Sequence, residues 1–189
     1  MLIVVTGNGK GKTTSALGQS LRMIGRGKKV LFIQFIKGPW KSGEDEFVAK
    51  LKNQKPKLSS EQISGLENLY DFEIRKMGKG FVGILDDDLP FEEHKKSAQN
   101  ALKEFETELG SNKWDMIVLD EINVATSLKL LTPQEVLKSL KNVPLEKFVM
   151  LTGRSAPQEF IDAADLVSEV KEIKHPFNDG KLAKIALEF

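Results

Sequence analysis

Short apolar segments alternate with longer amphipathic segments along most of the chain. The apolar segments are rich in β-branched and large aliphatic residues, and they have the length and composition of strands buried in a parallel sheet. Predicted strands lie at Leu2–Val5, Val30–Ile36, Phe72–Met77, Trp114–Leu119 and Lys147–Thr152, with two more near Leu166–Val170 and over Ala183–Phe189.

The segments between these strands carry apolar residues at helical spacing. Leu17, Leu21 and Ile24 predict a helix that ends near Gly25 and Gly27, because glycine commonly follows the last turn of a helix. Strands that alternate with helices in this way predict an α/β fold with a mostly parallel central sheet and helices on both faces. A long helix is predicted from about Phe91 to Leu109 with a core-facing stripe at Ala98, Leu102, Phe105 and Leu109, and shorter helices begin near Pro133 and after Pro157.

Two polar stretches interrupt this alternation. Residues 53–65 contain a proline and several serines and are predicted to form a solvated connection. Residues 78–90 combine three glycines, Phe81 and the run Asp86–Asp88. Two interpretations of this second stretch stay open: a solvated connection, or a lid that carries Phe81. Consecutive aspartates point in different directions, so the run favours a turn over a metal site.

Composition narrows the class of protein. With 189 residues the chain is long enough for a substantial core, so we expect a single domain over residues 1–189. The 28 basic and 27 acidic residues leave a net charge of +1, which provides no overall basic field for nucleic acid or a membrane surface. Cysteine is absent, and no signal-type or membrane-spanning apolar run occurs, so we expect a cytoplasmic protein without thiolate metal sites.

A glycine-rich motif directly follows the first predicted strand. The stretch TGNGKGKTT at Thr6–Thr14 joins that strand to the first predicted helix. Such a turn aims backbone N–H groups and the positive end of a helix dipole at one anion. It would place Lys12 on the outer phosphates of a nucleotide and the Thr13 hydroxyl on a phosphate-bound Mg²⁺. The strict pattern GxxxxGK[ST] has glycine where this chain has Thr6, so the loop is a variant; nucleotide binding is favoured over a turn without a ligand.

A second motif ends another predicted strand. In Met116–Glu121 an apolar run is followed by the carboxylates of Asp120 and Glu121. Taken alone, an Asp-Glu pair after a strand is as often a helix N-cap as a metal-binding element. Beside a phosphate-binding loop, one carboxylate can hold Mg²⁺ while the other orients a nucleophile or ligand. Together the motifs predict nucleotide binding with Mg²⁺ as cofactor and make Lys12, Thr13 and Glu121 the candidate catalytic residues. They leave the reaction open, because this core hosts ATPases, kinases and transferases.

Further sequence blocks occur in order along nearly the whole chain. They are QFIKGPW at Gln34–Trp40 with Gly43 and Glu44 behind it, Gly80 with Phe81, VLDEIN at Val118–Asn123, LTGRSAP at Leu151–Pro157, ADLVSEV at Ala164–Val170 and KHPFNDG at Lys174–Gly180. With the glycine-rich loop, these blocks resemble the P-loop (RecA-like) family of ATP:corrinoid adenosyltransferases. The resemblance implies a P-loop NTPase fold. It also implies that the cobalt of a Co(I) corrinoid attacks the 5′ carbon of ATP and that the whole triphosphate leaves.

The resemblance assigns roles by position. Thr13 with Asp120 or Glu121 would hold Mg²⁺, and Phe81 falls on an apolar residue that helps to displace the lower ligand of the corrinoid. Glu44, Trp40 and His175 are the other candidates for the corrinoid side. The family also implies a homodimer and an electron-donating reductase as partners. The implied nucleotide contacts are Gly7, Asn8, Gly9, Lys10, Gly11, Lys12, Thr13, Thr14, Arg22 and Arg154.

Three functions stay open at this point. The leading one is the corrinoid adenosyltransferase. The second is a RecA-like Mg²⁺-dependent ATPase in which Glu121 polarises water. The third is a nucleotide-binding module without corrinoid turnover, because this chain has Gly83 where the family usually has tryptophan two residues after the position of Phe81.

Three aromatic or imidazole side chains allow different interpretations. Trp40 follows Gly38-Pro39 and is either a loop anchor or a ligand contact. His175 precedes a proline and either packs in a turn or lines the corrinoid site. His94 lies in EEHKK at the start of a predicted helix, and we expect it to be solvated.

Overall fold

A six-stranded parallel sheet forms the centre of the molecule. The computed structural model describes residues 1–53, 71–83, 87–180, 182 and 184. The strand order is β3-β2-β4-β5-β1-β6, and every neighbouring pair is parallel. The predicted parallel sheet is therefore confirmed. The strands are β1 (Leu2–Thr6), β2 (Val30–Gln34), β3 (Phe72–Lys76), β4 (Met116–Asp120), β5 (Phe148–Thr152) and β6 (Leu166–Glu169).

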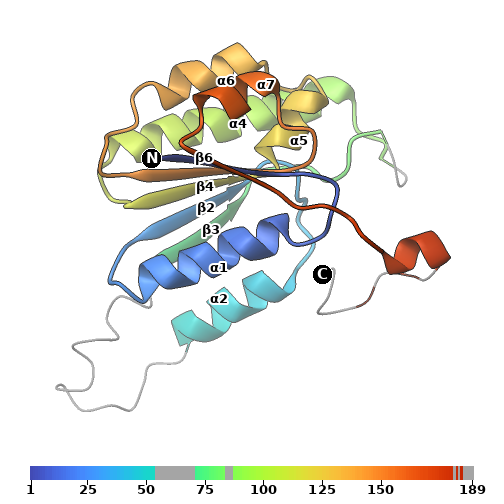
Figure 1. The fold of residues 1–189 in the computed structure, drawn as a ribbon, viewed down its shortest axis with the longest axis horizontal. Coiled ribbons are helices and arrows are strands. Elements are labelled where there is room, and N and C mark those ends of the chain that lie inside the picture. Colours follow the sequence, from blue (N-terminus) through green and yellow to red (C-terminus); the bar gives the residue numbers. More distant parts are fainter. Residues whose placement is uncertain (54–70, 84–86, 181, 183, 185–189) are drawn as a thin grey trace.

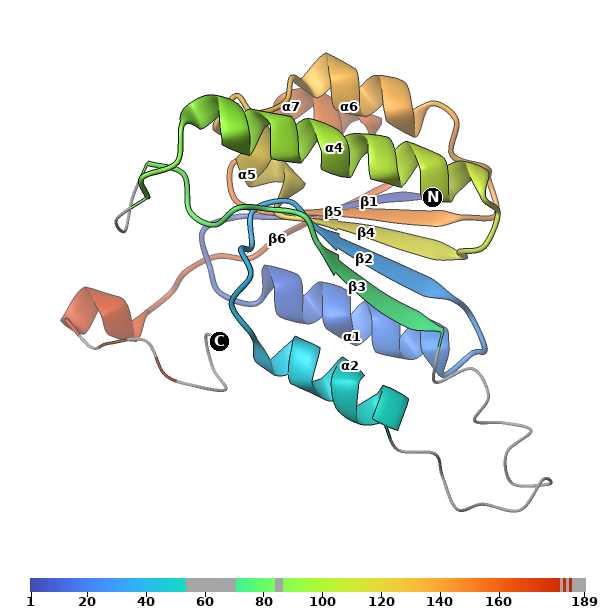
Figure 2. The same cartoon turned by 180° about the vertical axis from the view of Figure 1, so that it is seen from behind.

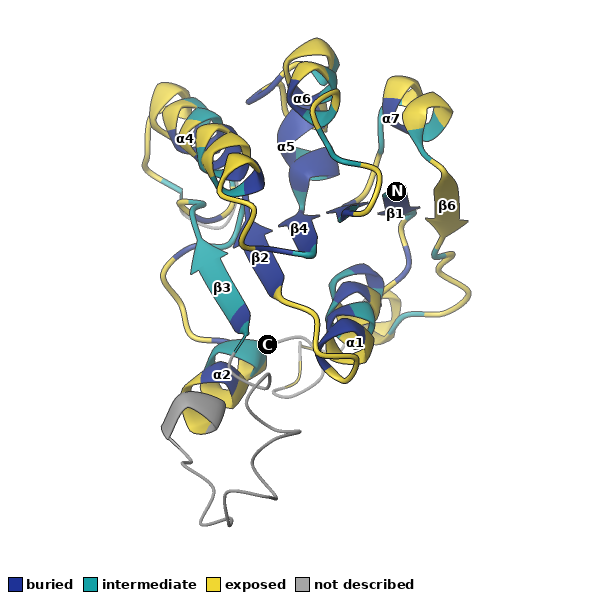
Figure 3. Cartoon of the chain, turned by 90° about the vertical axis from the view of Figure 1, so that its left-hand side faces the viewer, coloured by how far each residue is buried: buried dark blue, intermediate teal, exposed yellow. Residues whose placement is uncertain are grey.

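Helices cover both faces of this sheet, as predicted (Figures 1 and 2). On one face lie α1 (Lys12–Ile24) and α2 (Gly43–Asn53), and on the other lie α4 (Phe91–Gly110), α5 (Ile122–Ser127), α6 (Pro133–Leu140) and α7 (Gln158–Ala163). The end-on view of Figure 3 shows the resulting three layers. The short 3₁₀ helix η2 (Pro176–Asp179) lies away from the sheet in both views.

The core is divided into two halves by the sheet, because successive side chains of a strand point to opposite faces. All five residues of β2 are buried. Leu31 and Ile33 pack in the cluster under α4, whereas Val30 and Phe32 pack in the cluster that includes Ala16 of α1. Burial on both faces explains why the central strands are apolar without alternation.

The edge strand β6 differs from this pattern. All four of its residues are exposed, including Leu166 and Val167, and Figure 3 shows it at the rim of the sheet. It pairs with β1 on one side only. The apolar sequence correctly predicted that a strand forms here. Whether its side chains are buried depends on which elements pack against it, and that is decided by the tertiary structure.

Local sequence signals explain several helix boundaries. At α6, the Thr132 hydroxyl accepts a hydrogen bond from the Glu135 N–H, while the Glu135 carboxylate accepts one from the Thr132 N–H. This capping box, followed by Pro133 at the first helical position, starts the helix where the sequence predicted it. The stripe at Ala98, Leu102, Phe105 and Leu109 of α4 is buried, which confirms that prediction.

Two of the described α-helices were not predicted. Helix α2 begins after Ser42, whose N–H and hydroxyl both donate to the Asp45 carboxylate, and this contact between the residue before the helix and its third residue was the missed signal. Helix α5 spans only Ile122–Ser127, which is too short for a 3.6-residue period to be seen. The predicted connection at residues 53–65 lies outside the described residues except for Asn53, and the predicted strand at Ala183–Phe189 does so except for Lys184.

The prediction for His94 was wrong. Its imidazole is buried at the start of α4 and pairs with Asp87. The charged neighbours in EEHKK indicated a polar surface, but His94 lies one turn before Ala98, on the same face of the helix as the core stripe. A buried imidazole is stable when a polar group pairs with it, and the Asp87 carboxylate provides that group.

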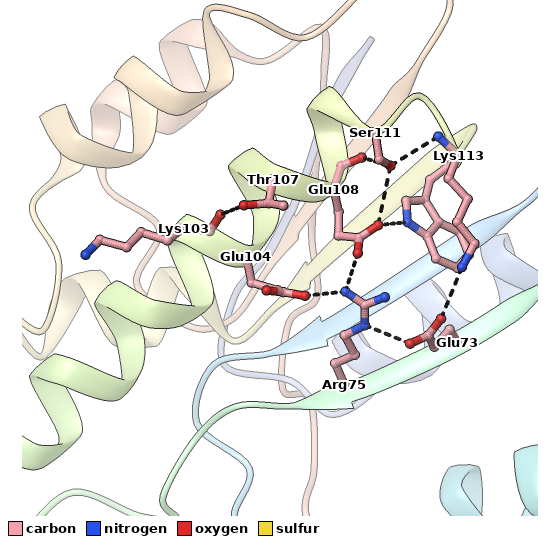
Figure 4. A network of polar contacts seen from close by, with 9 residues as sticks. Glu73, Arg75, Lys103, Glu104, Thr107, Glu108, Ser111 and Lys113 are labelled. Carbon is pink, nitrogen blue, oxygen red and sulfur yellow. Dashed lines mark hydrogen bonds and ion pairs between the residues drawn. The ribbon is translucent and has the colours of Figure 1, made fainter.

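An ion cluster joins the outer strand β3 to α4 (Figure 4). The Arg75 guanidinium donates to Glu73 at 2.7 Å and to Glu108 at 2.6 Å, and it also pairs with Glu104. The Trp114 indole N–H donates to the second oxygen of Glu108 at 2.5 Å. These carboxylates raise the pKa of Arg75, beginning with the hydrogen bond to Glu73, although partial burial opposes them. The cluster therefore fastens the edge of the sheet to its covering helix.

Substitution of Arg75 tests this fastening. We expect Arg75→Ala to lower the free energy of unfolding by about 1 to 3 kcal/mol, because charged hydrogen bonds are lost and partly buried carboxylates are left without a partner. Urea denaturation measures the change. The matched variant Arg26→Ala removes an exposed arginine just after α1 and should alter stability by less than about 0.5 kcal/mol. Equal effects of the two variants would contradict a structural role for the cluster.

Candidate functional site

The two sequence motifs meet at the carboxyl ends of the central strands. The glycine-rich loop, residues 6–14, leaves β1 and opens α1, while Asp120 ends β4. The strand order places β5 between β1 and β4. In a parallel sheet this edge, at the point where the connections diverge, is the usual place for a ligand.

The glycines of the loop are required by close packing and by backbone conformation. A Cβ on Gly7 would lie 2.4 Å from the carbonyl oxygen of Val170, and one on Gly9 would lie 2.6 Å from that of Lys171. The Gly9 N–H donates to the Val170 carbonyl at 2.7 Å. Gly11 has φ of 120° and open space around its missing Cβ. The first two glycines thus seat the loop on the chain after β6, and the third turns the backbone into α1.

Lys12 lies inside the loop. Its side chain is buried, and its ammonium donates to the Gly9 carbonyl at 2.7 Å. Burial lowers the pKa of Lys12, and the nearby negative charge of Glu121 opposes that change. Because the ammonium already lies among the backbone groups of the loop, a polyphosphate in the loop would contact it without a large rearrangement of the side chain.

Asp120 is the centre of a buried hydrogen-bond network. Its Oδ1 accepts from the hydroxyl of Thr13 at 3.0 Å and from that of Thr152 at 2.7 Å, and its Oδ2 accepts from the Gln34 amide at 3.2 Å. Burial raises the pKa of Asp120, whereas the three hydrogen bonds lower it. The network connects the carboxyl ends of β2, β4 and β5 to the first turn of α1.

Glu121 lies beside this network in a left-handed backbone conformation, with φ of 62°. Its N–H donates to the Thr152 hydroxyl at 3.0 Å. The pKa of Glu121 is raised to about 7, mainly by burial and also by the negative charge of Asp120. The positive charges of Lys12 and Arg154 oppose this change. A Cβ on Gly153 would lie 3.2 Å from a carboxylate oxygen of Glu121, so the glycine after β5 leaves room for this side chain.

Thr152 was not among the candidate residues, although its hydroxyl contacts both acidic residues. It donates to Asp120 and accepts from the Glu121 backbone. The sequence signal that indicates it is its place at the end of β5, directly before Gly153-Arg154. Gln34, the end of β2, lies opposite Asp120 in the sheet register. Both residues hold the carboxylates in place.

The structure places the two candidate arginines differently. Arg154 is exposed directly after β5, and its charge acts on the pKa of both Lys12 and Glu121. Arg22 is exposed in the last turn of α1. At ~1.5 Å per residue it lies about 15 Å from Lys12 along the helix axis, so the structure does not bring it to the loop. Asn8, Lys10 and Thr14 are exposed on the loop and the helix start, where a ligand can reach them.

An exposed aromatic pair lies at the same edge of the sheet. The rings of Trp40 and Phe81 are stacked, with centroids 6.5 Å apart and planes inclined by 28°. The side chains are 63% and 50% exposed. A Cβ on Gly38 or Gly80 would lie within 2.7 Å of the indole, so Trp40 rests directly on two segments of backbone. Trp40 is thus a loop anchor that also presents an aromatic face to solvent.

Ion pairs hold the loop that carries Trp40. Lys37 pairs with Glu44 in the first turn of α2. Lys76, at the end of β3, pairs with Asp45 and also donates to the Trp40 carbonyl. Glu44 therefore lies near the aromatic pair along the chain, with its charge matched by Lys37. His175 precedes η2, and its carbonyl accepts from the Asn178 N–H at 3.0 Å.

Comparison with known proteins decides the family. The sequence pattern of "ATP:corrinoid adenosyltransferase BtuR/CobO/CobP" matches residues 1–189. The chain belongs to the ATP:corrinoid adenosyltransferase family. The chain is similar to the corrinoid adenosyltransferase of Escherichia coli (strain K12), with 31% identity over 189 residues, 100% of this chain and 85% of the relative. It shares 33% identity over 189 residues with that of Pseudomonas aeruginosa, covering 100% of this chain and 83% of the relative.

The solved structures agree on the fold of this adenosyltransferase. The flagellar accessory protein FlaH from Methanocaldococcus jannaschii superposes with a TM-score of 0.52 at 12% identity, covering 89% of this chain and 70% of that one. Likeness at this identity concerns the fold alone. With the parallel sheet and the glycine-rich loop, it confirms the predicted α/β fold of the P-loop (RecA-like) class.

Family membership also selects among the three functions that the sequence left open. The enzyme is a corrinoid adenosyltransferase, which transfers the 5′-deoxyadenosyl group of ATP to the cobalt of a reduced corrinoid. The RecA-like ATPase that hydrolyses ATP is therefore the less supported alternative.

Proposed function

We propose that the loop at residues 6–14 binds the triphosphate of ATP and stabilises it as the leaving group of the transfer. The two electrons of Co(I) form the cobalt–carbon bond to the 5′ carbon, and the C5′–O bond breaks so that the triphosphate leaves with its electron pair. The observation that supports this role most directly is the buried ammonium of Lys12 within the loop. Such a cation stabilises negative charge that grows on the phosphate oxygens.

No proton has to be moved in this reaction, and the site suits that requirement. The ionisable groups at the loop are lysines, Arg154 and two carboxylates, and neither histidine of the chain lies on the loop or at the ends of β1, β4 and β5. The proposed roles of Gly7, Asn8, Gly9, Lys10, Gly11, Thr14 and Arg154 are phosphate or nucleotide contacts. Arg22 is included only if the nucleotide extends along α1.

The residues present fit a Mg²⁺ ion bound together with ATP. Mg²⁺ commonly takes one or two protein carboxylates and completes its octahedron with phosphate oxygens and water. Asp120, Glu121 and the Thr13 hydroxyl lie together at the loop. Within the described part of the chain, no group of three or more acidic or histidine side chains forms a complete cage. Thr13, Asp120 and Glu121 would hold the ion, which neutralises charge on the leaving triphosphate when bound.

The raised pKa of Glu121 predicts pH dependence of Mg²⁺ binding. Below about 7 the carboxyl group is protonated, and a metal must displace that proton. The apparent Mg²⁺ affinity in the presence of ATP should therefore fall by up to about tenfold per pH unit below 7 and level off above it. Titration calorimetry from pH 5.5 to 8.5 measures this.

The variant Glu121→Gln is the control for that titration. ATP itself titrates in the same range, because terminal phosphates have pKa values of about 6. This contribution is common to both proteins, so the difference between them reports the carboxyl group. The same pH slope in wild type and Glu121→Gln would exclude Glu121 as the titrating ligand.

The aromatic pair is the proposed corrinoid contact. Trp40 and Phe81 present stacked rings to solvent, and a flat apolar surface suits the face of a planar macrocycle. We assign Phe81 to displacement of the lower ligand, after which a four-coordinate Co(II) accepts an electron more easily. Glu44 and His175 are the proposed polar contacts. Gly83 provides no second ring, whereas Trp40 provides one that touches Phe81.

Phe81→Ala tests this assignment. We expect the variant to react several-fold more slowly with a Co(II) corrinoid and a physiological reductant, while its reaction with chemically reduced Co(I) corrinoid changes little, because only the first substrate requires loss of the lower ligand. Both rates are measured from the absorbance of the light-sensitive product. Leu89→Ala, which truncates another exposed apolar side chain near the same loop, is the matched control. An equal loss on both substrates would contradict the assignment.

The complete function is tested by its products. With ATP and Co(I) corrinoid, the enzyme should form triphosphate and a light-sensitive cobalt–carbon bond in equal amounts. Steady release of ADP and phosphate without corrinoid would instead support the RecA-like ATPase. Tight ATP binding without either product would support a nucleotide-binding module that has lost corrinoid turnover, the function suggested by Gly83.

Further proposals concern the protein as a whole. We place residues 1–189 in one domain, with a homodimeric state, a cytoplasmic location and an electron-donating reductase as partner. The near-zero net charge supports the absence of nucleic acid as a partner. Among the described residues, no helix has the length and apolar character needed to cross a membrane. Sedimentation of the purified protein measures the oligomeric state directly.

A further inference from the structure

The segment that carries Phe81 is attached to the protein on both sides. On the N-terminal side, the N–H of Gly78 donates to the Gln34 carbonyl at 3.1 Å, and that of Gly80 donates to the Ile36 carbonyl at 2.9 Å. These bonds continue the pairing of β3 with β2 beyond the end of the strand. Phe81 is the next residue, so its backbone begins at a fixed point.

On the C-terminal side, the attachment is a single carboxylate. The N–H of Gly83 donates to Oδ2 of Asp87 at 2.8 Å, and the N–H of Leu89 donates to Oδ1 at 3.3 Å. Asp87 thus holds the backbone of Gly83 on one side and of Leu89 on the other. Only Phe81 and Val82 lie between the anchored residues Gly80 and Gly83.

His94 fixes the position of that carboxylate. Its Nε2 lies 3.1 Å from Oδ1 and 3.0 Å from Oδ2 of Asp87. The imidazole is 3% exposed, and the Asp87 side chain is 9% exposed. His94 belongs to the first turns of α4, where side chains lean toward the helix N-terminus and so toward the preceding loop. The rest of α4 is anchored in the core by Ala98, Leu102 and Phe105.

The charges around the pair favour an ionised Asp87. The Gly83 N–H contributes most to a lowered pKa of Asp87, ahead of the Leu89 N–H and His94. The carboxylate also lies near the N-terminus of α4, where negative charge is favourable. A second contact joins the same helix to the start of the loop, since the Ser97 hydroxyl donates to the Met77 carbonyl. The helix therefore holds the loop at its start and at its end.

We propose that His94 and Asp87 are positioning residues for the transfer: through the Gly83 amide they hold Phe81 against Trp40, in the place where it meets the corrinoid. This inference rests on the role proposed above for Phe81. A buried histidine that served only packing would need one partner. Here the partner is the Asp87 carboxylate, whose two oxygens also accept from the backbone N–H groups of Gly83 and Leu89. The position of helix α4 therefore fixes the position of this loop.

Hydrogen exchange tests the anchoring without corrinoid. In His94→Ala, and independently in Asp87→Ala, the amides of Gly83 and Leu89 should exchange about tenfold faster or more, because a charge-assisted hydrogen bond is lost. His94→Gln keeps an N–H donor at the same reach and should restore slow exchange. Leu102→Ala weakens the packing of α4 without touching the loop, so it controls for lost stability. Unchanged exchange in both alanine variants overturns the proposal.

Fluorescence reports the aromatic pair separately. Of the two tryptophans in the chain, Trp40 is exposed and Trp114 is buried, so iodide quenches mainly Trp40. Loosening of Phe81 in His94→Ala should increase quenching, and His94→Gln should return it to the wild-type value. Equal quenching in wild type and His94→Ala would show that the pair does not hold Phe81 on Trp40, and it would overturn the proposal.

The ratio of the two reaction rates completes the test. His94→Ala should lower the rate with Co(II) corrinoid and reductant several-fold more than the rate with Co(I) corrinoid, as Phe81→Ala does, and His94→Gln should restore the ratio. One outcome would overturn the proposal that His94 positions Phe81. In that outcome the amides of Gly83 and Leu89 exchange faster and Phe81→Ala changes the ratio of the Co(II) and Co(I) rates, but His94→Ala leaves that ratio unchanged. If Phe81→Ala leaves the ratio unchanged, the role of Phe81 fails and positioning fails with it, while the exchange rates still decide whether Asp87 and His94 anchor the loop.

Discussion

Replacement of Lys12 by alanine is expected to lower adenosyl transfer by about 10²- to 10³-fold, the usual cost of removing one preorganised group that stabilises developing negative charge. The ammonium lies buried within the loop and contacts only a backbone carbonyl among the described residues, that of Gly9. Its loss removes a buried cation from the loop that we propose as the site of the leaving triphosphate. Initial rates with saturating Co(I) corrinoid and varied ATP measure the effect.

The fold should survive this substitution, because Lys12 is not one of the hydrophobic residues that form the two halves of the core, and alanine is compatible with the first turn of a helix. Its melting temperature should stay within a few degrees of that of the wild type. Lys28→Ala is the matched control: it removes a lysine that pairs with Asp115 at the opposite edge of the sheet, and it should leave the transfer rate unchanged. Wild-type turnover in Lys12→Ala would remove the assignment of the loop as the triphosphate site.

Asp120→Asn is expected to lower transfer by about 10²-fold or more, since the charged ligand proposed for Mg²⁺ is lost. The fold can accommodate the amide. The buried Oε1 of Gln34 has no hydrogen-bond partner in the described part of the chain, and rotation of that side-chain amide would let it accept from the new N–H₂ group. The hydroxyls of Thr13 and Thr152 can also turn. We therefore expect the free energy of unfolding to change by less than about 1 to 1.5 kcal/mol.

The variant Asp120→Ala distinguishes the contribution of the hydrogen-bond network to stability from the contribution of the Asp120 carboxylate to the reaction. This variant leaves the donors of Thr13, Thr152 and Gln34 without an acceptor, and each buried donor costs roughly 1 to 3 kcal/mol. A loss of about 3 to 5 kcal/mol of unfolding free energy is the expected result, measured by urea denaturation. If both Asp120 variants were equally unstable, the activity of Asp120→Asn would carry no information about the metal. If Asp120→Asn kept full Mg²⁺-dependent activity, Asp120 would not be a ligand.

Most of the fold could be predicted from local patterns. The strands at Leu2–Thr6, Val30–Gln34 and Met116–Asp120 are apolar without alternation because both faces of the sheet are covered. The secondary-structure predictions fail where the pattern of apolar residues is short or is hidden among charged residues. Helix α5 has too few residues for a period to show. The cap of Ser42 with Asp45 that starts α2 lies beside the conspicuous motif around Trp40.

In the candidate site, too, some residues could be predicted from the sequence and others could not. Lys12, Thr13, Asp120 and Glu121 were indicated by motifs that end strands, and the structure brings all four together. Thr152 lies in the block LTGRSAP but was assigned no role from the sequence, yet its hydroxyl contacts both acidic residues. His94 was assigned to solvent from its charged neighbours and is instead buried against Asp87.

The local sequence alone therefore determined the parts of this enzyme whose physics is local: apolar strands, helix caps, and a glycine-rich turn that opens a helix, a backbone geometry that suits an anion. Tertiary structure decided which side chains meet. The register of β2, β4 and β5 places Gln34 and Thr152 on Asp120, and the packing of α4 brings His94 to the loop that carries Phe81. The contacts of Asp120 join residues 32 and 86 positions apart in the chain, whereas His94 and Asp87 are 7 positions apart. The free energy of all three contacts depends on burial, which exists only once the elements have packed.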